Sequence, residues 1–225
     1  MAASFAKFWP SEIGLTIYAQ DFTAENTVDL YQEAPWLAPW KAQRSPEDRG
    51  KHLIPRQRFK RDAVRFSHKV AALGAGLEAA DCDVLIWLDA DVLTYAPVTV
   101  DWLDSLFPPP APMAWLDRTK KYAETSFMMF RLPDGGDVIR RVVAMYQGET
   151  VFGLAETHDG FVFQHVVDTG EIGAHSLSGE GRKWHNAFVN SPLATRMDHL
   201  KRRKGEDRTP RDVRVEPGGG RYWNG

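Results

Sequence analysis

The chain is poor in the features that mark secreted and membrane proteins. Cys82 is the single cysteine among 225 residues, so the chain cannot form an internal disulfide. No apolar run approaches the ~20 residues that a membrane-spanning helix needs, and the N-terminus lacks the basic start, apolar core and cleavage site of a secretory signal. These absences predict a protein that needs no membrane and works in a reducing cytoplasm.

Length and composition are those of an ordinary globular domain. Hydrophobic residues make up 43% of the chain and charged residues 26%, values typical of soluble proteins. A length of 225 residues allows one α/β domain with a substantial core and is short for two domains and a linker. We therefore expect one domain over residues 1–216, followed by a loose, glycine-containing tail over residues 217–225.

Positive charge is unevenly distributed, although the net charge is only −2. Residues 41–69 contain ten Lys and Arg against three Asp and Glu, a balance of +7. Residues 196–214 contain eight against four, a balance of +4, which leaves −13 for the rest of the chain. Segregated positive charge attracts phosphates and so suggests a polyanionic partner. The alternative is that these segments are solvated faces and loops, as charged runs usually are.

The most informative stretch is VLIWLDADV, residues 84–92, in which five apolar residues end abruptly at Asp89 and Asp91. A short apolar run bounded by turn signals is typical of a central strand of a parallel sheet, covered on both faces. Open α/β sheets bind their ligands at the carboxyl ends of such strands. Two carboxylates at that edge supply hard oxygen ligands for Mg²⁺ or Mn²⁺, and the bound metal ion can in turn bind a diphosphate. A second pair, Asp81 and Asp83, precedes the strand and is expected to lie in a solvated turn.

The hydrophobic pattern predicts alternating strands and helices. Apolar residues recur at steps of three and four over residues 59–77, which predicts an amphipathic helix. Residues 34–55 contain Pro and Trp and are expected to form a loop, and Asp137 is expected to cap a helix that reaches residue 147. The expected strands are 15–18, 84–88, 92–98, 113–116 and 126–132. Further helices are expected at 101–107 and at 160–167, with a strand as the alternative for the second.

Five blocks of sequence occur in order along the chain. They are FWPSEIGLTIYAQDF (residues 8–22), RFSHKVAAL (65–73), VLIWLDADV (84–92), THDGFVFQHVV (157–167) and SPLATRMDHLKRRK (191–204). Together they resemble a group of small phage-encoded glycosyltransferases, several of which are associated with adding a sugar to hydroxymethylated cytosine in DNA. The resemblance implies the A-type fold of nucleotide-sugar glycosyltransferases, a single Rossmann-like α/β domain with a mostly parallel central sheet.

One departure from that fold lies at the start of the chain. Members usually begin with a strand and loop that cradle the nucleobase, whereas this chain starts at the helix that would follow, over residues 2–9. Either the first strand is missing or the base is held differently.

The resemblance implies a metal site at the end of the 84–88 strand. Asp91 would bind Mn²⁺ or Mg²⁺ directly, and Asp89 would contact the donor ribose, or the metal through water. His199 would complete the site, because a neutral imidazole is a suitable ligand for Mn²⁺. The plainer alternatives are an Asp turn that closes the strand and a histidine on the surface. In related retaining enzymes a Gly stands three residues after this histidine, where this chain has Arg202.

Four basic residues are candidates for holding the donor nucleotide sugar. Lys201 and Lys204 would neutralise the diphosphate as its bond to the sugar breaks. Arg65 and Lys69, on the flank of the 59–77 helix, would approach the donor from the other side. Each of the four is also explained as a solvated surface charge.

Two carboxylates are candidates for direct roles in the reaction. Asp159 begins an apolar helix, where it would orient or deprotonate the acceptor hydroxyl as a general base or serve as the helix N-cap. Glu124, just before the 126–132 strand, would bind sugar hydroxyls.

The expected function is metal-dependent transfer of a sugar from a nucleotide diphosphate, with a UDP-sugar as the first choice, to a hydroxyl group. The acceptor that we name first is 5-hydroxymethylcytosine, or another hydroxymethylpyrimidine, in double-stranded phage DNA, which places the protein in the host cytoplasm. The alternatives are a cell-surface glycan or protein acceptor, and a nucleotide-sugar or DNA-binding module without catalysis. A nucleotidyltransferase also uses an Asp pair with metal, but a third nearby carboxylate is usual there, and the sequence offers no convincing one.

Overall fold

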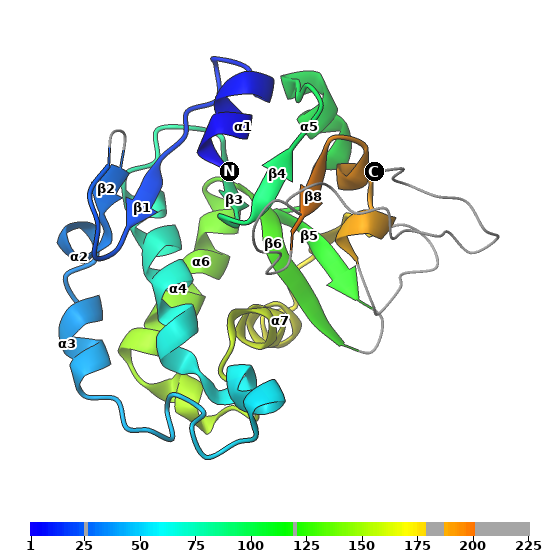
Figure 1. Ribbon diagram of the computed structural model, residues 1–225. Coiled ribbons are helices and arrows are strands. Elements are labelled where there is room, and N and C mark those ends of the chain that lie inside the picture. The colour runs from blue at the N-terminus through cyan, green and yellow to red at the C-terminus, as the bar shows by residue number, and fades with distance from the viewer. Residues whose placement is uncertain (25–26, 119–120, 179–186, 201–225) are drawn as a thin grey trace. The chain divides into compact units, whose positions relative to one another are not determined.

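The structure is a computed structural model that describes residues 1–24, 27–118, 121–178 and 187–200 (Figure 1). Its chain divides into two units. The first unit comprises Met1–Gly14, Ile86–Phe130 and the chain from Gly173 onward, and the second comprises Leu15–Leu85 and Arg131–Ile172. The expectation of a single domain over residues 1–216 stays a prediction.

The first unit contains most of the strands. Its elements are α1 (Ala2–Phe8), β3 (Val84–Leu88, whose first two residues belong to the second unit), β4 (Val92–Thr94), α5 (Val100–Leu106), β5 (Met113–Arg118), β6 (Lys121–Arg131), β7 (His175–Ser176), the 3-10 helices η3 (Phe188–Asn190) and η4 (Pro192–Thr195), and β8 (Met197–His199).

Two sheets are built from these strands. One has four strands in the order β3-β6-β5-β7, and the other pairs β4 with β8. Strand β5 runs antiparallel to β6 and parallel to β7. Strands β4 and β8 run antiparallel and lie side by side in Figure 1. Val92 lies opposite His199.

The prediction of a mixed α/β fold is confirmed, but the described residues do not form one mostly parallel central sheet. Only two residues separate Arg118 from Lys121 in the sequence. Such a short connection joins antiparallel strands, whereas parallel strands need a crossover of a dozen or more residues. Strand β3 is not covered on both faces as expected either, because each of its five residues is only half-buried.

Strand β6 is irregular at a point that matters for the site. Trp115 pairs with Met128, whereas the next residue of β5, Leu116, pairs with Glu124. One step along β5 therefore corresponds to four along β6 (128 − 124 = 4). Such bulges bend a strand and change the direction of its side chains. Ser126 lies within this bulge.

The second unit is mainly helical. Its elements are β1 (Ile17–Ala19), β2 (Thr27–Asp29), α2 (Leu30–Glu33), α3 (Leu37–Ala42), the 3-10 helix η1 (Pro55–Arg61), α4 (Ala63–Glu78), α6 (Asp134–Gln147), the 3-10 helix η2 (Thr150–Gly153) and α7 (Asp159–Thr169). Strands β1 and β2 are parallel. Helix α4 packs against α6 and α7, which also pack against each other.

Helix α4 shows why this segment is helical. Asp62 caps it by accepting a hydrogen bond of 3.1 Å from the backbone N–H of Arg65. Val70 and Leu73 are buried on the apolar face, as the periodicity predicts. A Cβ added at Gly74 would lie 3.0 Å from Cγ2 of Val143 on α6, so the absence of a side chain lets the two helices approach closely.

Most other expected elements are present with shifted ends. The predicted helices 101–107 and 160–167 are α5 and α7, the expected helix at 2–9 is α1, and the strands 84–88 and 113–116 are β3 and β5. The prediction of a loop over residues 34–55 is wrong at α3. The tail expected over residues 217–225 lies outside the described residues. No helix in the described part of the chain is both long and apolar enough to cross a membrane.

Candidate metal centre

The residues Asp89, Ala90 and Asp91 form the tight turn between β3 and β4. The turn is closed by a hydrogen bond of 2.9 Å from the N–H of Val92 to the carbonyl of Asp89. A second bond of 2.9 Å runs from the N–H of Asp89 to the carbonyl of Ser126 in the β6 bulge. Both ends of the turn are thus fixed by backbone contacts, and the two Asp side chains start from defined positions.

His199 reaches this turn through the pairing of β4 with β8. Because Val92 lies opposite His199, the histidine comes beside the residue that follows Asp91. The N–H of Leu200 donates a hydrogen bond of 2.9 Å to the carbonyl of Asp91, which continues the ladder. Residues far apart in sequence are therefore brought together by one short antiparallel ladder.

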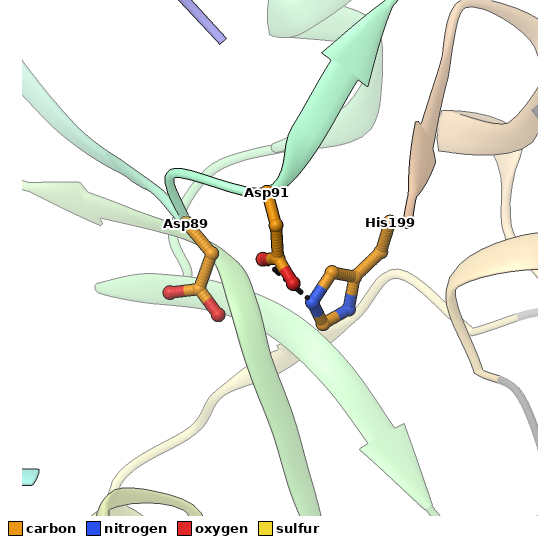
Figure 2. Close-up of side chains that lie close together, drawn as sticks. All are labelled: Asp89, Asp91 and His199. Carbon is orange, nitrogen blue, oxygen red and sulfur yellow. Dashed lines mark ion pairs between the residues drawn. The ribbon is translucent and has the colours of Figure 1, made fainter. Parts of the chain in front are cut away.

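Asp89, Asp91 and His199 form the one group of metal-ligand type found among the described residues. A ligand atom of each lies within 4.8 Å of a ligand atom of the other two. Figure 2 shows the three side chains projecting to the same side from the ends of β3, β4 and β8. Carboxylate oxygens with one imidazole nitrogen suit Mn²⁺, and the carboxylates alone suit Mg²⁺. The donor set and its spacing therefore fit a divalent cation.

His199 lies between two carboxylates. Its Nε2 lies 3.0 Å from Oδ1 of Asp91, and its Nδ1 lies 3.3 Å from Oε1 of Glu124. Burial of the ring lowers the pKa of His199, but the hydrogen bonds and negative charges of Asp91 and Glu124 outweigh it and raise the pKa to about 9. In the metal-free protein the imidazole is therefore charged at neutral pH and compensates the carboxylates. A cation that takes its place must displace that proton.

Glu124 lies beside His199, and its expected role in binding sugar hydroxyls stays a prediction. Its side chain is 11% exposed and is directed at His199. Oε2 lies 3.7 Å from the guanidinium of Arg118, so the carboxylate is held between two cationic groups. The sequence reasoning selected the residue, but its contact with the histidine depends on the β6 bulge.

Trp87 was missed by the sequence reasoning and contacts the Asp pair directly. Its indole Nε1–H donates a hydrogen bond of 2.6 Å to Oδ1 of Asp89. The signal was available, because residues two apart on a strand share a face, and Trp87 lies two positions before Asp89.

Lys69 and Asp159 come together in the second unit. Lys69 Nζ lies 2.6 Å from Oδ2 of Asp159, and the two side chains are 12% and 8% exposed. Oδ1 of Asp159 also accepts a hydrogen bond of 2.8 Å from the N–H of Gly160. This pair joins α4 to α7, and a role of either residue in donor binding or catalysis stays a prediction.

The alternative role given for Asp159, as the N-cap of its helix, is wrong. The N-cap is His158, whose Nδ1 accepts a hydrogen bond of 3.3 Å from the N–H of Phe161. Asp159 is the first helical residue, where its negative charge also suits the N-terminal end of the helix dipole. His158 is 3% exposed, and its Nε2 lies 3.0 Å from Oε2 of Glu156.

The other basic candidates are placed only in part. Arg65 is exposed on α4, with its guanidinium over the ring of Phe66 at 5.4 Å. Lys201 and Lys204 lie outside the described residues. So does Arg202, which stands where related retaining enzymes have a Gly.

Comparison of the chain with protein-family models, with curated proteins and with solved structures found no match. The cluster of Asp89, Asp91 and His199 is therefore the feature of this protein that points to a function. Two carboxylates and an imidazole at strand ends can hold one divalent cation, and the half-exposed Asp91 side chain, at 46%, leaves the group open to a ligand from solvent.

Proposed function

We propose that this protein is a metal-dependent glycosyltransferase that moves a sugar from a nucleotide diphosphate to a hydroxyl group. The single observation that carries the proposal is the convergence of Asp89, Asp91 and His199 within 4.8 Å. The ordered sequence blocks resemble nucleotide-sugar glycosyltransferases, and this resemblance links the cluster to binding of a nucleotide diphosphate sugar. The proposal includes the A-type fold, supported by strand β3 ending in the Asp pair and by the return strand β4.

The residues of the cluster have distinct tasks in this proposal. When bound, a divalent cation neutralises the diphosphate leaving group. Asp91 and His199 hold the cation, and Asp89, oriented by Trp87, holds the donor ribose or the cation through water. The fixed turn between β3 and β4 keeps Asp89 and Asp91 in place before the donor arrives, so little rearrangement of these two side chains is needed on binding.

The placement of Glu124 bears on the nucleotidyltransferase alternative. That class usually adds a third carboxylate to the metal ligands. Glu124 is a third carboxylate in the region, but it contacts Nδ1 of His199, whereas Asp91 contacts Nε2. This arrangement favours a partner of the histidine over a third ligand, and so favours the glycosyltransferase.

The acceptor that we propose is a hydroxymethylpyrimidine in DNA. Support comes from the balance of +7 over residues 41–69 and of +4 over residues 196–214. An enzyme that acts on a base in a duplex must take that base out of the stack. Binding should then weaken steeply with salt, with a log-log slope of about −0.9 for each phosphate neutralised.

One experiment tests donor, metal and acceptor together. The protein is incubated with a panel of nucleotide sugars and Mn²⁺, with hydroxymethylated or plain DNA, and the nucleosides are analysed by mass. A gain of one sugar mass on the modified base alone supports the proposal. Asp89→Asn and Asp91→Asn should lose this product, whereas Asp81→Asn and Asp83→Asn, the matched pair before β3, should keep it.

Two outcomes would redirect the proposal. Transfer to glycans or proteins, insensitive to salt, would keep the enzyme class and replace the acceptor. Binding of a nucleotide sugar without transfer to any acceptor and without donor hydrolysis would favour the non-catalytic module.

A further inference from the structure

We propose that Glu124 is a positioning residue for His199: its carboxylate accepts a hydrogen bond from Nδ1–H of the neutral imidazole, and the lone pair of Nε2 is then available to a divalent cation. The inference rests on the metal site of the proposed function and adds to it a residue that orients one of the ligands, His199. It concerns cation binding, which can be measured without any sugar or nucleotide.

The geometry around the imidazole carries the inference. Nε2 lies 3.0 Å from Oδ1 of Asp91, on the side of the cluster. Nδ1 is buried and makes no hydrogen bond of good geometry, and Oε1 of Glu124 lies 3.3 Å from it. The side chain of His199 is 10% exposed, and the ring of Phe188 lies 6.0 Å away between centroids. The surrounding residues thus hold the ring in one orientation, with one nitrogen for each carboxylate.

Histidine chemistry explains why the second carboxylate matters. A neutral imidazole carries one N–H, and a nitrogen binds a metal only through its lone pair. A carboxylate at Nδ1 favours the tautomer with the proton on Nδ1, which frees Nε2 for the cation. The same partner makes the ligating nitrogen more basic, and loss of such a partner typically weakens metal affinity roughly 10- to 100-fold.

Glu124 is itself held for this task. Its other oxygen, Oε2, lies 3.7 Å from the guanidinium of Arg118. Arg118 in turn donates a hydrogen bond of 3.1 Å to the carbonyl of Tyr122. The β6 bulge places Glu124 opposite Leu116 instead of continuing the register from Trp115. An ion pair and a strand irregularity therefore both fix the carboxylate on the far side of the imidazole from the Asp pair.

The test uses Mn²⁺ alone as the probe. Free Mn²⁺ is titrated against the full-length protein by electron paramagnetic resonance, for the wild type, Glu124→Gln and Glu124→Leu. Glu124→Leu removes both the charge and the acceptor, so we expect roughly 10- to 100-fold weaker binding. Glu124→Gln keeps an acceptor oxygen and should lie between the two. Glu12→Gln, a change at an exposed glutamate of the same unit, should bind like the wild type.

A double-mutant cycle separates positioning from a general effect on the fold. If Glu124 acts through His199, Glu124→Leu should weaken Mn²⁺ binding in the wild type and have no effect in the His199→Ala background. An equal loss in both backgrounds would overturn the inference, as would unchanged affinity of a folded Glu124→Leu. If His199→Ala binds no Mn²⁺, the test is the order of Mn²⁺ affinity among the wild type, Glu124→Gln and Glu124→Leu. Equal affinity of these three proteins would overturn the inference. Absence of Mn²⁺ binding by the wild type would overturn it as well.

Failure of this inference is distinguishable from failure of the proposed function. The expected Mn²⁺ pattern without sugar transfer would leave Glu124 as the positioning residue of a metal site with another activity. Sugar transfer by a Glu124→Leu variant with unchanged Mn²⁺ affinity would overturn the positioning role alone.

Discussion

The charged imidazole of His199 should make the stability of the metal-free protein depend on pH. The perturbation is a rise from pH 6 to pH 10 in the presence of a chelator. Burial opposes the charge, but contacts with Asp91 and Glu124 raise the folded-state pKa of His199 from its ordinary 6.5 to about 9. The folded protein therefore binds this proton more tightly than the unfolded chain does, and the proton stabilises the fold.

The sign and size of the effect follow from that difference. Stabilisation is fully present below about pH 6.5 and is lost as the pH rises through about 9. A difference of about 2.5 pKa units at 1.36 kcal/mol each gives about 3 kcal/mol of unfolding free energy.

Urea denaturation at several pH values, followed by circular dichroism, measures this loss. His199→Gln should remove most of the pH dependence between 6.5 and 9, whereas His52→Gln, at an exposed histidine, should retain it. Parallel curves for the wild type and His199→Gln across this range would refute the reasoning.

Three further substitutions test the site and the second unit. Asp91→Asn should abolish Mn²⁺ binding with an unchanged circular dichroism spectrum, because one charged ligand is lost at constant shape; Asp81→Asn is the control, and near wild-type affinity of the first variant would refute the assignment. Trp87→Phe removes the indole N–H that orients the first aspartate of the pair, so Mn²⁺ affinity should fall severalfold in calorimetry; an unchanged value would mean that this hydrogen bond is dispensable. Lys69→Met leaves the buried Asp159 carboxylate without its cation and should cost roughly 3–5 kcal/mol in urea unfolding. Replacing both members of that pair by apolar residues should recover much of the loss, and a single variant as stable as the wild type would contradict the buried-pair interpretation.

Local patterns predicted the parts of the site that lie close together in sequence. Strand β3 and the Asp89–Asp91 turn follow from five apolar residues that end at two carboxylates. Trp87 was predictable by the same logic, because residues two apart on a strand share a face. The pairing of His199 with Asp91 was not, since no local pattern joins β4 to β8, and only the resemblance suggested it.

Tertiary packing decided the elements that the sequence did not predict. Residues 34–55 looked irregular because of their prolines, yet Pro39 lies in the first turn of α3, where a missing N–H costs little. Asp137 was expected to cap the helix that reaches residue 147, but α6 begins three residues earlier, at Asp134, and includes Gly135 and Gly136. A Cβ on Gly136 would lie 3.0 Å from Cδ1 of Leu77, so the glycine admits a neighbouring side chain. The contact of Glu124 with His199 depends on a bulge that no periodicity announces.

Because β4 pairs with β8, the complete site can form only after β8 has been synthesised. Asp89 and Asp91 leave the ribosome well before His199, which is 108 residues beyond Asp91 (199 − 91). A nascent chain, or one cut before residue 199, holds the acidic ligands without the imidazole. A cation bound by all three ligands would clasp β8 to the turn before β4, and at a concentration 100 times its dissociation constant it would add about 2.7 kcal/mol to the folded state. Binding by all three ligands is then possible only in chains whose synthesis has passed His199.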